Sequence, residues 1–496
     1  MRKIILLSDG TGNGAAKKER TNVWRLYNAL DLHKSDQVAY YDDGVGSEEF
    51  LPLQILGGAF GFGLKRNVLE LYKFLCRNYK DGDKIYLLGF SRGAFTVRIL
   101  AGLIARCGLY TDYTSETDLD ERVKNNYSLF RTGFTHRGLS KIYFILNDVH
   151  EYKDGTLFPE IEFIGVWDTV DAYGFPVDEI TSFWDRFIFP IYFPNQKLSP
   201  KVKRANQALC IDDERQTFHP ILWDECDESA LEAEGKVTAN RIEQVWFSGA
   251  HSDVGGGYPM NNLALVSLDW MISKIEVSES RTDGLIFISG IRNEIHNQSD
   301  WHGIQHNPRS GAGAYYRYKP RMISEFYINK EGNPINKIPK IHFSVLERIK
   351  DNVVTYAPLG IPADYEVIST EGMKIDTYES DEQKKKRMAL TEEVMDIVNS
   401  RVKLYYGLLF TTLILLGSRF FLEWSPTMEC EGVGCILKPL SSLLPSFVVD
   451  WFDALSQNPL WLFIFGGTFG ILFMKKTSWW HETKVKMMQA WKALKM

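Results

Sequence analysis

Cysteine is scarce in this chain, and its cysteines do not have the spacing of a metal site. Only six occur among 496 residues, and four of them are scattered over the first half: Cys76, Cys107, Cys210 and Cys226. Scattered thiols are typical of core or incidental residues rather than of a zinc site or a disulfide framework. We therefore predict no metal site.

An excess of basic charge is also missing. The chain has 57 lysines and arginines against 63 aspartates and glutamates, for a formal net charge of −6. Proteins that bind nucleic acid usually carry a basic patch or stripe, and none stands out in the first 370 residues. The composition predicts no nucleic-acid partner.

The N-terminus lacks the long apolar segment of a signal peptide. The apolar run Ile4–Leu7 ends at Ser8, Asp9 and Gly10, which is too early for such a segment. We expect no signal peptide.

The most informative motif is Gly89-Phe90-Ser91-Arg92-Gly93. A short apolar run precedes it, and the periodic pattern of residues 94–104 that follows predicts a helix. A serine between two glycines at a sharp strand-to-helix turn is typical of the nucleophile of a hydrolase. The motif predicts Ser91 as a nucleophile.

Strand and helix patterns alternate along residues 1–275. Apolar runs at 3–7, 37–41, 85–88, 141–146, 161–167 and 241–247 predict strands, and 22–30, 68–79, 94–104 and 263–275 predict helices. This alternation favours a mostly parallel sheet with helices on both faces, an α/β fold resembling the α/β-hydrolases. We assign residues 1–372 to this catalytic domain.

A serine nucleophile needs a histidine base and an acid that orients the histidine. Asp168 directly follows an apolar strand, and His251 follows another in the glycine-dense segment 246–258. Ser91, Asp168 and His251 occur in the chain order of the α/β-hydrolases. Other residues remain open for these roles: Asp171 and Asp253 for the acid, and His219 and His150 for the base.

The oxyanion of the reaction needs backbone N–H donors. One is expected from Arg92, the residue after the nucleophile. The second is expected in the turn after the first strand, at Gly10 or Thr11.

Several motifs together resemble the α/β-hydrolase domain of the first group of type VI secretion lipase effectors. They lie in order over residues 1–260: Asp9-Gly10-Thr11-x-Asn13, Thr21-Asn22-Val23, the glycine-rich segment 57–63, Gly89–Ala94, Gly165–Val170, Ala208–Pro220 and Gly249–Tyr258. The resemblance implies phospholipase activity through Ser91, Asp168 and His251, with no metal or organic cofactor.

The C-terminal part has a different composition. A charged linker is predicted at 373–400, followed by long apolar runs at 404–418 and 459–474. Residues 401–476 are therefore predicted to form a transmembrane hairpin with an outer loop, and 477–496 an amphipathic cytoplasmic tail. Cys430 and Cys435 would lie in the outer loop, where a disulfide is permitted.

Basic residues flank both runs, whereas the intervening segment is mainly acidic. By the positive-inside rule both ends lie in the cytoplasm. We therefore predict a multi-pass protein of the inner membrane with a cytoplasmic catalytic domain and C-terminus.

Together these patterns predict a membrane-tethered serine lipase of the phospholipase A type. Its partners would be a phospholipid substrate and the bilayer, with room for a regulatory or immunity partner and for oligomers. Its role would be that of a regulated antibacterial or phage-defence effector. Two alternatives stay open: a serine esterase or thioesterase acting on soluble acyl substrates, and a non-catalytic membrane-anchored module that uses a hydrolase fold for binding.

Overall fold

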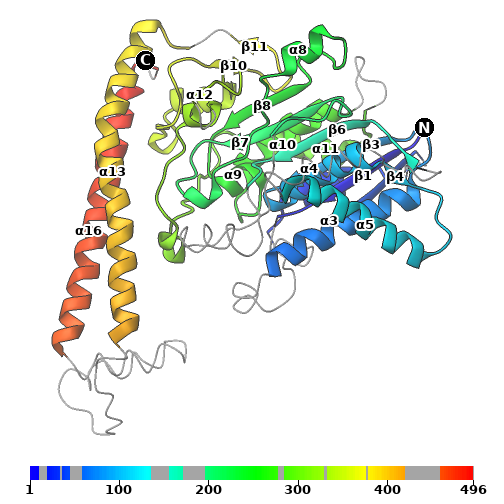
Figure 1. Ribbon diagram of the computed structural model, residues 1–496. Coiled ribbons are helices and arrows are strands. Elements are labelled where there is room, and N and C mark those ends of the chain that lie inside the picture. The colour runs from blue at the N-terminus through cyan, green and yellow to red at the C-terminus, as the bar shows by residue number, and fades with distance from the viewer. Residues whose placement is uncertain are drawn as a thin grey trace.

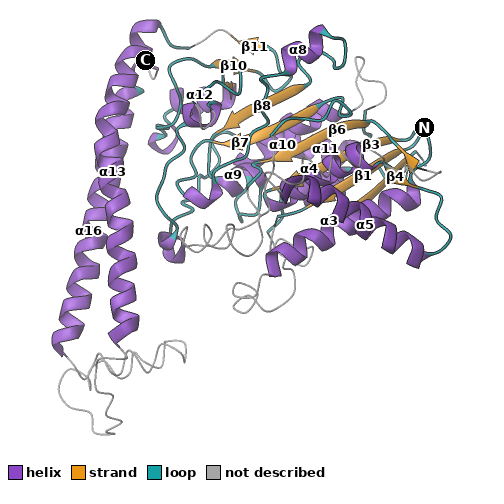
Figure 2. Cartoon of the chain, in the orientation of Figure 1, coloured by secondary structure: helices purple, strands orange, loops and turns teal. Residues whose placement is uncertain are grey.

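A large, mostly parallel β-sheet organises the protein. The computed structural model describes residues 1–10, 19–33, 36–44, 59–135, 156–170, 196–276, 284–328, 332–375, 378–418 and 459–494. Within these residues the sheet has nine strands in the order β11-β10-β9-β8-β7-β6-β3-β1-β2, and β11 is antiparallel to its neighbour (Figures 1 and 2). The mostly parallel α/β fold predicted from the sequence is confirmed.

The strands are short, and most of their residues are buried. Their bounds are β1 (Lys3–Ser8), β2 (Gln37–Asp42), β3 (Lys84–Phe90), β6 (Ile161–Trp167), β7 (Ala205–Cys210), β8 (Ile242–Phe247), β9 (Lys340–His342), β10 (Glu366–Ile368) and β11 (Lys374–Ile375). β4 (Leu109–Tyr110) and β5 (Thr156–Leu157) form a separate small ribbon. The strand predicted at 141–146 lies outside the described residues.

Helices join the strands and cover the sheet. They are α1 (Asn22–Ala29), α3 (Ala59–Asn78), α4 (Arg92–Cys107), α5 (Glu116–Thr135), α8 (Glu228–Ala233), α9 (His251–Gly255), α10 (Asn262–Ile275), α11 (Ser289–Gln298), α12 (Phe343–Lys350), α13 (Asp381–Gly417) and α16 (Pro459–Ala490). α1 begins where the sequence predicts, since the Thr21 side chain accepts a hydrogen bond from the Trp24 N–H.

Alternate residues of β1 pack in two different cores. Ile4 and Leu6 of β1 pack in one cluster with residues of α3, α4 and α5. Ile5 and Leu7 pack in the other with residues of α1 and α10. Because successive strand side chains point to opposite faces, strands that are apolar throughout need helices on both sides.

α3 begins earlier than the sequence predicts. The sequence predicts this helix only over residues 68–79, but residues 59–63, within the glycine-rich segment 57–63, form the start of α3. A glycine costs a helix only about 1 kcal/mol relative to alanine. The buried face that α3 presents from Leu64 to Tyr72 contributes enough packing to outweigh this cost.

α13 and α16 lie side by side against the edge of the α/β domain that carries β10 and β11 (Figure 1). Residues 381–400, assigned to a linker from their charge, form the first half of α13, capped by Ser380. Trp491 and Met487 enter a third core with Trp246 of β8 and residues of α12.

The predicted transmembrane hairpin is wrong, and so is the predicted location as a multi-pass inner-membrane protein. No helix in the described part of the chain is both long and apolar enough to cross a membrane. The charge-free parts of the two helices cover only 404–417 and 459–474, whereas a span needs about 20 apolar residues. The predicted outer loop, with Cys430 and Cys435, lies outside the described residues.

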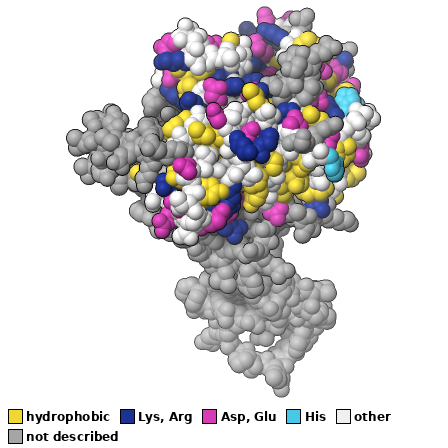
Figure 3. All heavy atoms as spheres, turned by 90° about the vertical axis from the view of Figure 1, so that its right-hand side faces the viewer, with side chains coloured by type: hydrophobic (Ala, Val, Ile, Leu, Met, Phe, Trp, Pro, Cys, Tyr) yellow, Lys and Arg dark blue, Asp and Glu magenta, His cyan; other side chains and the backbone are white. Residues whose placement is uncertain are grey.

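The face turned away from α13 and α16 carries basic and acidic side chains side by side. Figure 3 shows lysines and arginines interspersed with aspartates and glutamates, and no large area of one sign. On this face the charges of the protein largely offset one another over short distances.

Candidate active site

The carboxyl ends of β3, β6 and β8 bring the three predicted catalytic residues together. Ser91 follows β3, Asp168 follows β6, and His251 begins α9 after three residues that separate it from β8. All three strands are parallel and lie within four neighbouring positions of the sheet. Side chains that follow such strands therefore meet at one edge.

The side chains of the three residues form a hydrogen-bonded chain. His251 Nε2 lies 2.7 Å from Ser91 Oγ, and His251 Nδ1 lies 2.5 Å from Asp168 Oδ2. Each of the three residues is at most 6% exposed. This is the arrangement in which a histidine can remove the serine proton while a carboxylate holds the ring.

Ser91 occupies a strained turn that only glycine neighbours permit. Its φ is 59°, in the region that residues other than glycine rarely adopt. A Cβ added to Gly93 would lie 2.0 Å from the Ser8 carbonyl oxygen, and one added to Gly89 would lie 2.6 Å from that of Gly93. The two flanking glycines are therefore required by the close approach of the backbone.

The ionisation of Asp168 depends on a residue that the sequence analysis missed. Arg321 donates to both carboxylate oxygens, from Nη1 to Oδ1 at 2.6 Å and from Nη2 to Oδ2 at 2.8 Å. Burial alone would raise the pKa of Asp168, but the Arg321 charge and the hydrogen bond from His251 outweigh it and hold that pKa well below its usual range. Asp168 is thus an ion despite its complete burial.

His251 is held as a neutral base. Burial lowers its pKa below the usual 6.5, against the opposing effects of the hydrogen bond and charge of Asp168. The ring packs against Phe90 and Phe218, with centroids 4.6 and 5.0 Å away. A neutral imidazole can accept the serine proton at physiological pH.

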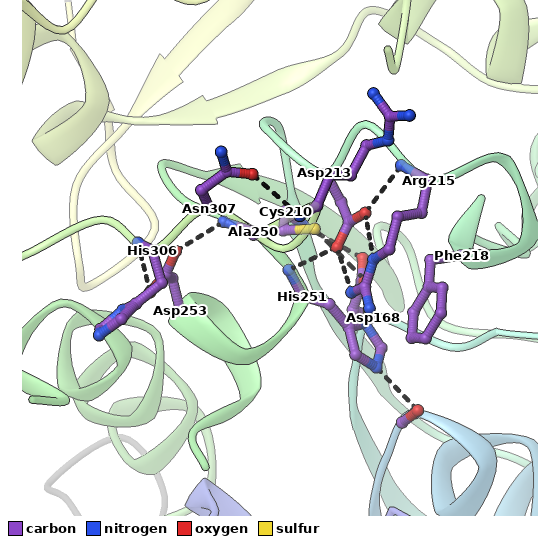
Figure 4. A network of polar contacts seen from close by, with 12 residues as sticks. Asp168, Cys210, Asp213, Arg215, Phe218, Ala250, His251, Asp253, His306 and Asn307 are labelled. Carbon is purple, nitrogen blue, oxygen red and sulfur yellow. Dashed lines mark hydrogen bonds and ion pairs between the residues drawn. The ribbon is translucent and has the colours of Figure 1, made fainter. Parts of the chain in front are cut away.

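Asp213 and Arg215 position His251 from a second side (Figure 4). Asp213 Oδ2 accepts the His251 backbone N–H at 3.1 Å and pairs with Arg215 Nη2 at 2.7 Å. The Arg215 guanidinium lies over the Phe218 ring, 3.5 Å from its centroid. Both residues belong to the segment 208–220 on which the family resemblance rests, so the sequence did contain a signal for them.

The alternative acids and bases lie elsewhere or outside the described residues. Asp253 accepts hydrogen bonds from the Ala250 N–H and from His306, on the far side of α9 from the His251 ring (Figure 4). His219 bonds the Lys319 carbonyl oxygen, and burial lowers its pKa to about 4. Asp171 and His150 lie outside the described residues.

Two of the three predicted oxyanion donors, Gly10 and Arg92, lie within the described residues. Arg92 is the first residue of α4, where backbone N–H groups have no acceptor within the helix. The Gly10 N–H donates to its neighbour Asp9 Oδ1 at 2.6 Å, and Thr11 lies outside the described residues. Burial raises the pKa of Asp9 to about 7, although the carboxyl also accepts from Thr21 and Tyr41.

Among the described residues, no group of histidine, cysteine, aspartate or glutamate side chains could hold a metal ion. The site thus consists of a serine, a histidine and an ionised carboxylate at the edge of a parallel sheet.

Residues 2–274 match the sequence profile of the type VI secretion family described as phospholipase effector Tle1-like, catalytic domain. The match covers more than half of the chain, and the protein belongs to this family. The family is one of phospholipases, in agreement with the resemblance found in the sequence.

The chain is also similar to individual proteins, over part of their length. It is 28% identical over 239 residues to the uncharacterized protein YEL023C of Saccharomyces cerevisiae, a match of 45% of this chain and 33% of that protein. A solved structure of an uncharacterized Pseudomonas aeruginosa protein is 17% identical with a TM-score of 0.33, over 60% of this chain and 48% of that one. The structure of the Tle1 effector bound to the VgrG spike is 17% identical with a TM-score of 0.27, over 52% of each chain.

Proposed function

We propose that this protein is a serine phospholipase that hydrolyses acyl esters of phospholipids. The observation that carries the proposal is the continuous hydrogen-bonded chain from Ser91 Oγ through His251 to the ionised Asp168. The strained turn at Ser91 and its glycine neighbours support it. A sharp turn of this kind places the serine hydroxyl at its tip, where a histidine base can reach it. Membership of the Tle1-like family supports the choice of a phospholipid as substrate.

In the first half of the reaction His251 Nε2 takes the Ser91 proton while Oγ attacks the ester carbonyl carbon. The negative charge that develops on the carbonyl oxygen is stabilised by the Arg92 N–H and by a second N–H, either that of Thr11 or that of Gly10 once it is released from Asp9 Oδ1. Asp168 keeps the other ring nitrogen protonated and stabilises the imidazolium. His251 then gives its proton to the leaving oxygen, and the lysolipid departs.

In the second half water replaces the leaving alcohol. His251 removes a proton from the water molecule as its oxygen attacks the acyl-enzyme, and returns that proton to Ser91 Oγ as the fatty acid leaves. Each half-reaction restores the neutral imidazole. The low pKa of His251 suits both halves, because the ring must begin each of them as a base.

We also propose that the protein meets its substrate at a lipid surface without spanning it. Several large apolar side chains on α13 and α16 are strongly exposed, among them Phe410 at 66%, Phe463 at 70% and Phe473 at 69%. Exposed apolar patches of this kind mark surfaces that contact other molecules or membranes.

The test is phospholipid hydrolysis in mixed micelles, with products identified by mass spectrometry. Wild type is compared with Ser91→Ala and with Ser289→Ala, a control in which an exposed serine of α11 is changed. We expect lysophospholipid and fatty acid from wild type and from the control, and from Ser91→Ala a rate about 10⁶-fold lower. Activity confined to soluble short-chain esters would favour the esterase alternative, and an active Ser91→Ala would refute the mechanism.

A further inference from the structure

Three basic side chains meet where α13 and α16 pack against the α/β domain. Arg309 precedes the short helix η2 (Gly311–Tyr315), Arg401 lies on α13 and Lys476 lies on α16. All three line one cavity of about 280 Å³. None of the described residues that line this cavity is acidic.

Arg309 and Arg401 both lie against one aromatic residue, Tyr318. Their guanidinium carbons lie 5.0 and 3.9 Å from the centroid of the Tyr318 ring. Arg309 is 6% exposed and donates to the carbonyl oxygens of Ala314 and Tyr316, which carry no formal charge. The geometry of both guanidinium groups is therefore set before any ligand arrives.

The local charge is not balanced. Arg401 reaches one carboxylate, Glu214, at 3.3 Å. No ion pair of Lys476 is found within the described part of the chain. Burial lowers the pKa of Lys476, and the charges of Arg309 and Arg401 lower it further. One carboxylate does not neutralise three partly buried cations, so the binding of an anion between them is favourable.

The remainder of the cavity wall is apolar and comes from both helices. Leu404 and Leu408 of α13 face Phe469, Leu472 and Phe473 of α16 across it. Phe473 is also 69% exposed, so that the wall continues into the outer surface of the helix pair. An anion site that continues into apolar surface matches a molecule with a charged head and a hydrocarbon chain.

We propose that this cavity is a binding site for an anionic lipid phosphate. The phosphate lies between Arg309, Arg401 and Lys476, and the first part of the acyl chain lies against the apolar residues of α13 and α16. Neither Ser91, Asp168 nor His251 lines this cavity, so that binding here does not require hydrolysis. Lipid binding at this site takes no part in the proposed hydrolysis and is tested separately from it.

The experiment uses the full chain with Ser91→Ala, which removes turnover of the titrated lipid. Dihexanoyl phosphatidic acid is titrated calorimetrically below its micelle concentration, and dihexanoyl phosphatidylcholine and inorganic phosphate are titrated in parallel. We expect phosphatidic acid to bind more tightly than either. In that background Lys476→Met weakens binding about 10- to 100-fold, the loss of one charged hydrogen bond. Lys475→Met, which removes the same charge from the exposed neighbouring position, leaves binding unchanged.

Three results would overturn the proposal. In the first, phosphatidic acid does not bind. In the second, both lysine variants weaken binding equally. In the third, inorganic phosphate binds as tightly as phosphatidic acid. The last result indicates a site for free phosphate. A measurement without mutation guards against misfolding: phosphatidic acid should protect Lys476, and not Lys475, from an amine-modifying reagent. Equal labelling of Lys476 with and without the lipid would also refute the site.

Discussion

Arg321 forms a bidentate ion pair with Asp168, although 153 positions of sequence separate them. The arginine lies beyond residues 2–274, the part of the chain that matches the family profile. Arg321 also donates to the carbonyl oxygens of Cys210 and Phe218. The orienting acid of the site is therefore held by a segment that the resemblance does not cover.

Replacement of Arg321 should change the pH dependence of activity. In Arg321→Met the Asp168 charge acts on His251 without the opposing charge of Arg321, which stabilises the imidazolium and raises the His251 pKa. We expect the acid limb of the wild-type kcat/KM profile below pH 6.5, because burial lowers the His251 pKa, and in the variant this limb should move to higher pH. Phospholipid hydrolysis between pH 4 and 9 measures the shift.

Arg321→Lys is the matched control, since it keeps the positive charge and loses the bidentate geometry. Its acid limb should stay near that of wild type while kcat falls. A folded Arg321→Met protein with an unchanged limb would show that Arg321 has no influence on the protonation of His251. Circular dichroism is needed for both variants, because an unpaired buried carboxylate costs about 3–5 kcal/mol.

Asp168→Asn should abolish most of the activity. The amide cannot stabilise the imidazolium, and in comparable sites this change lowers kcat about 10⁴-fold. Asp253→Asn is the control, because Asp253 bonds Ala250 and His306 rather than the His251 ring. A large loss in the Asp253 variant with little effect at Asp168 would reverse the two assignments.

Gly93→Ala should unfold the turn at Ser91. Its Cβ would lie 2.0 Å from the Ser8 carbonyl oxygen and 2.5 Å from that of Asp9, which are backbone atoms that cannot turn aside. We expect a loss of about 3 kcal/mol or more in the free energy of unfolding.

Gly290→Ala serves as its control. Gly290 lies in α11, and its added Cβ meets no atom within 4 Å. We expect this variant to be stabilised by about 0.4–1 kcal/mol. Urea denaturation of the two proteins tests both values, and equal stabilities would contradict the packing argument.

Asp212→Asn should stabilise the protein at alkaline pH. Burial raises the pKa of Asp212 from 3.8 to about 7, so the folded state binds a proton that the unfolded state has lost. The contribution of protonated Asp212 to the free energy of unfolding of wild type is therefore lost as pH rises from about 4 to about 7. The amide oxygen can still accept from the Gly249 N–H and the Tyr356 hydroxyl, which both bond Oδ2.

A pKa difference of about three units corresponds to a gain in the free energy of unfolding on the order of 4 kcal/mol at pH 8. It should vanish below pH 4, where Asp212 is protonated in both states. Urea denaturation of the two proteins at both pH values measures it. An equal effect at both would mean that the amide acts through packing rather than through the proton.

The sequence was most informative about the candidate catalytic residues that follow predicted strands. The apolar runs before Ser91 and Asp168 and before the loop of His251 predicted strands, and parallel strands align their carboxyl ends. Their side chains therefore meet in the structure as the chain order suggested. Whether they perform catalysis is the question that Ser91→Ala answers.

The C-terminal helices show where reasoning from composition fails. The runs 404–418 and 459–474 suggested membrane spans, because hydropathy alone does not record where a helix packs. In the structure Tyr405 and Thr411 are buried, and Tyr315 bonds Thr412 across the junction with the α/β domain. Part of the apolar surface of α13 is thus covered by protein.

By itself the sequence determined the parallel α/β sheet, the turn at Ser91 and the positions of Asp168 and His251, because strand periodicity and glycine requirements are local properties of the chain. Only the tertiary structure decided that Arg321 holds Asp168 as an ion, and that Arg309, Arg401 and Lys476 share one cavity. Charge pairing depends on distance in space, and no pattern along the chain records which distant segments fold side by side.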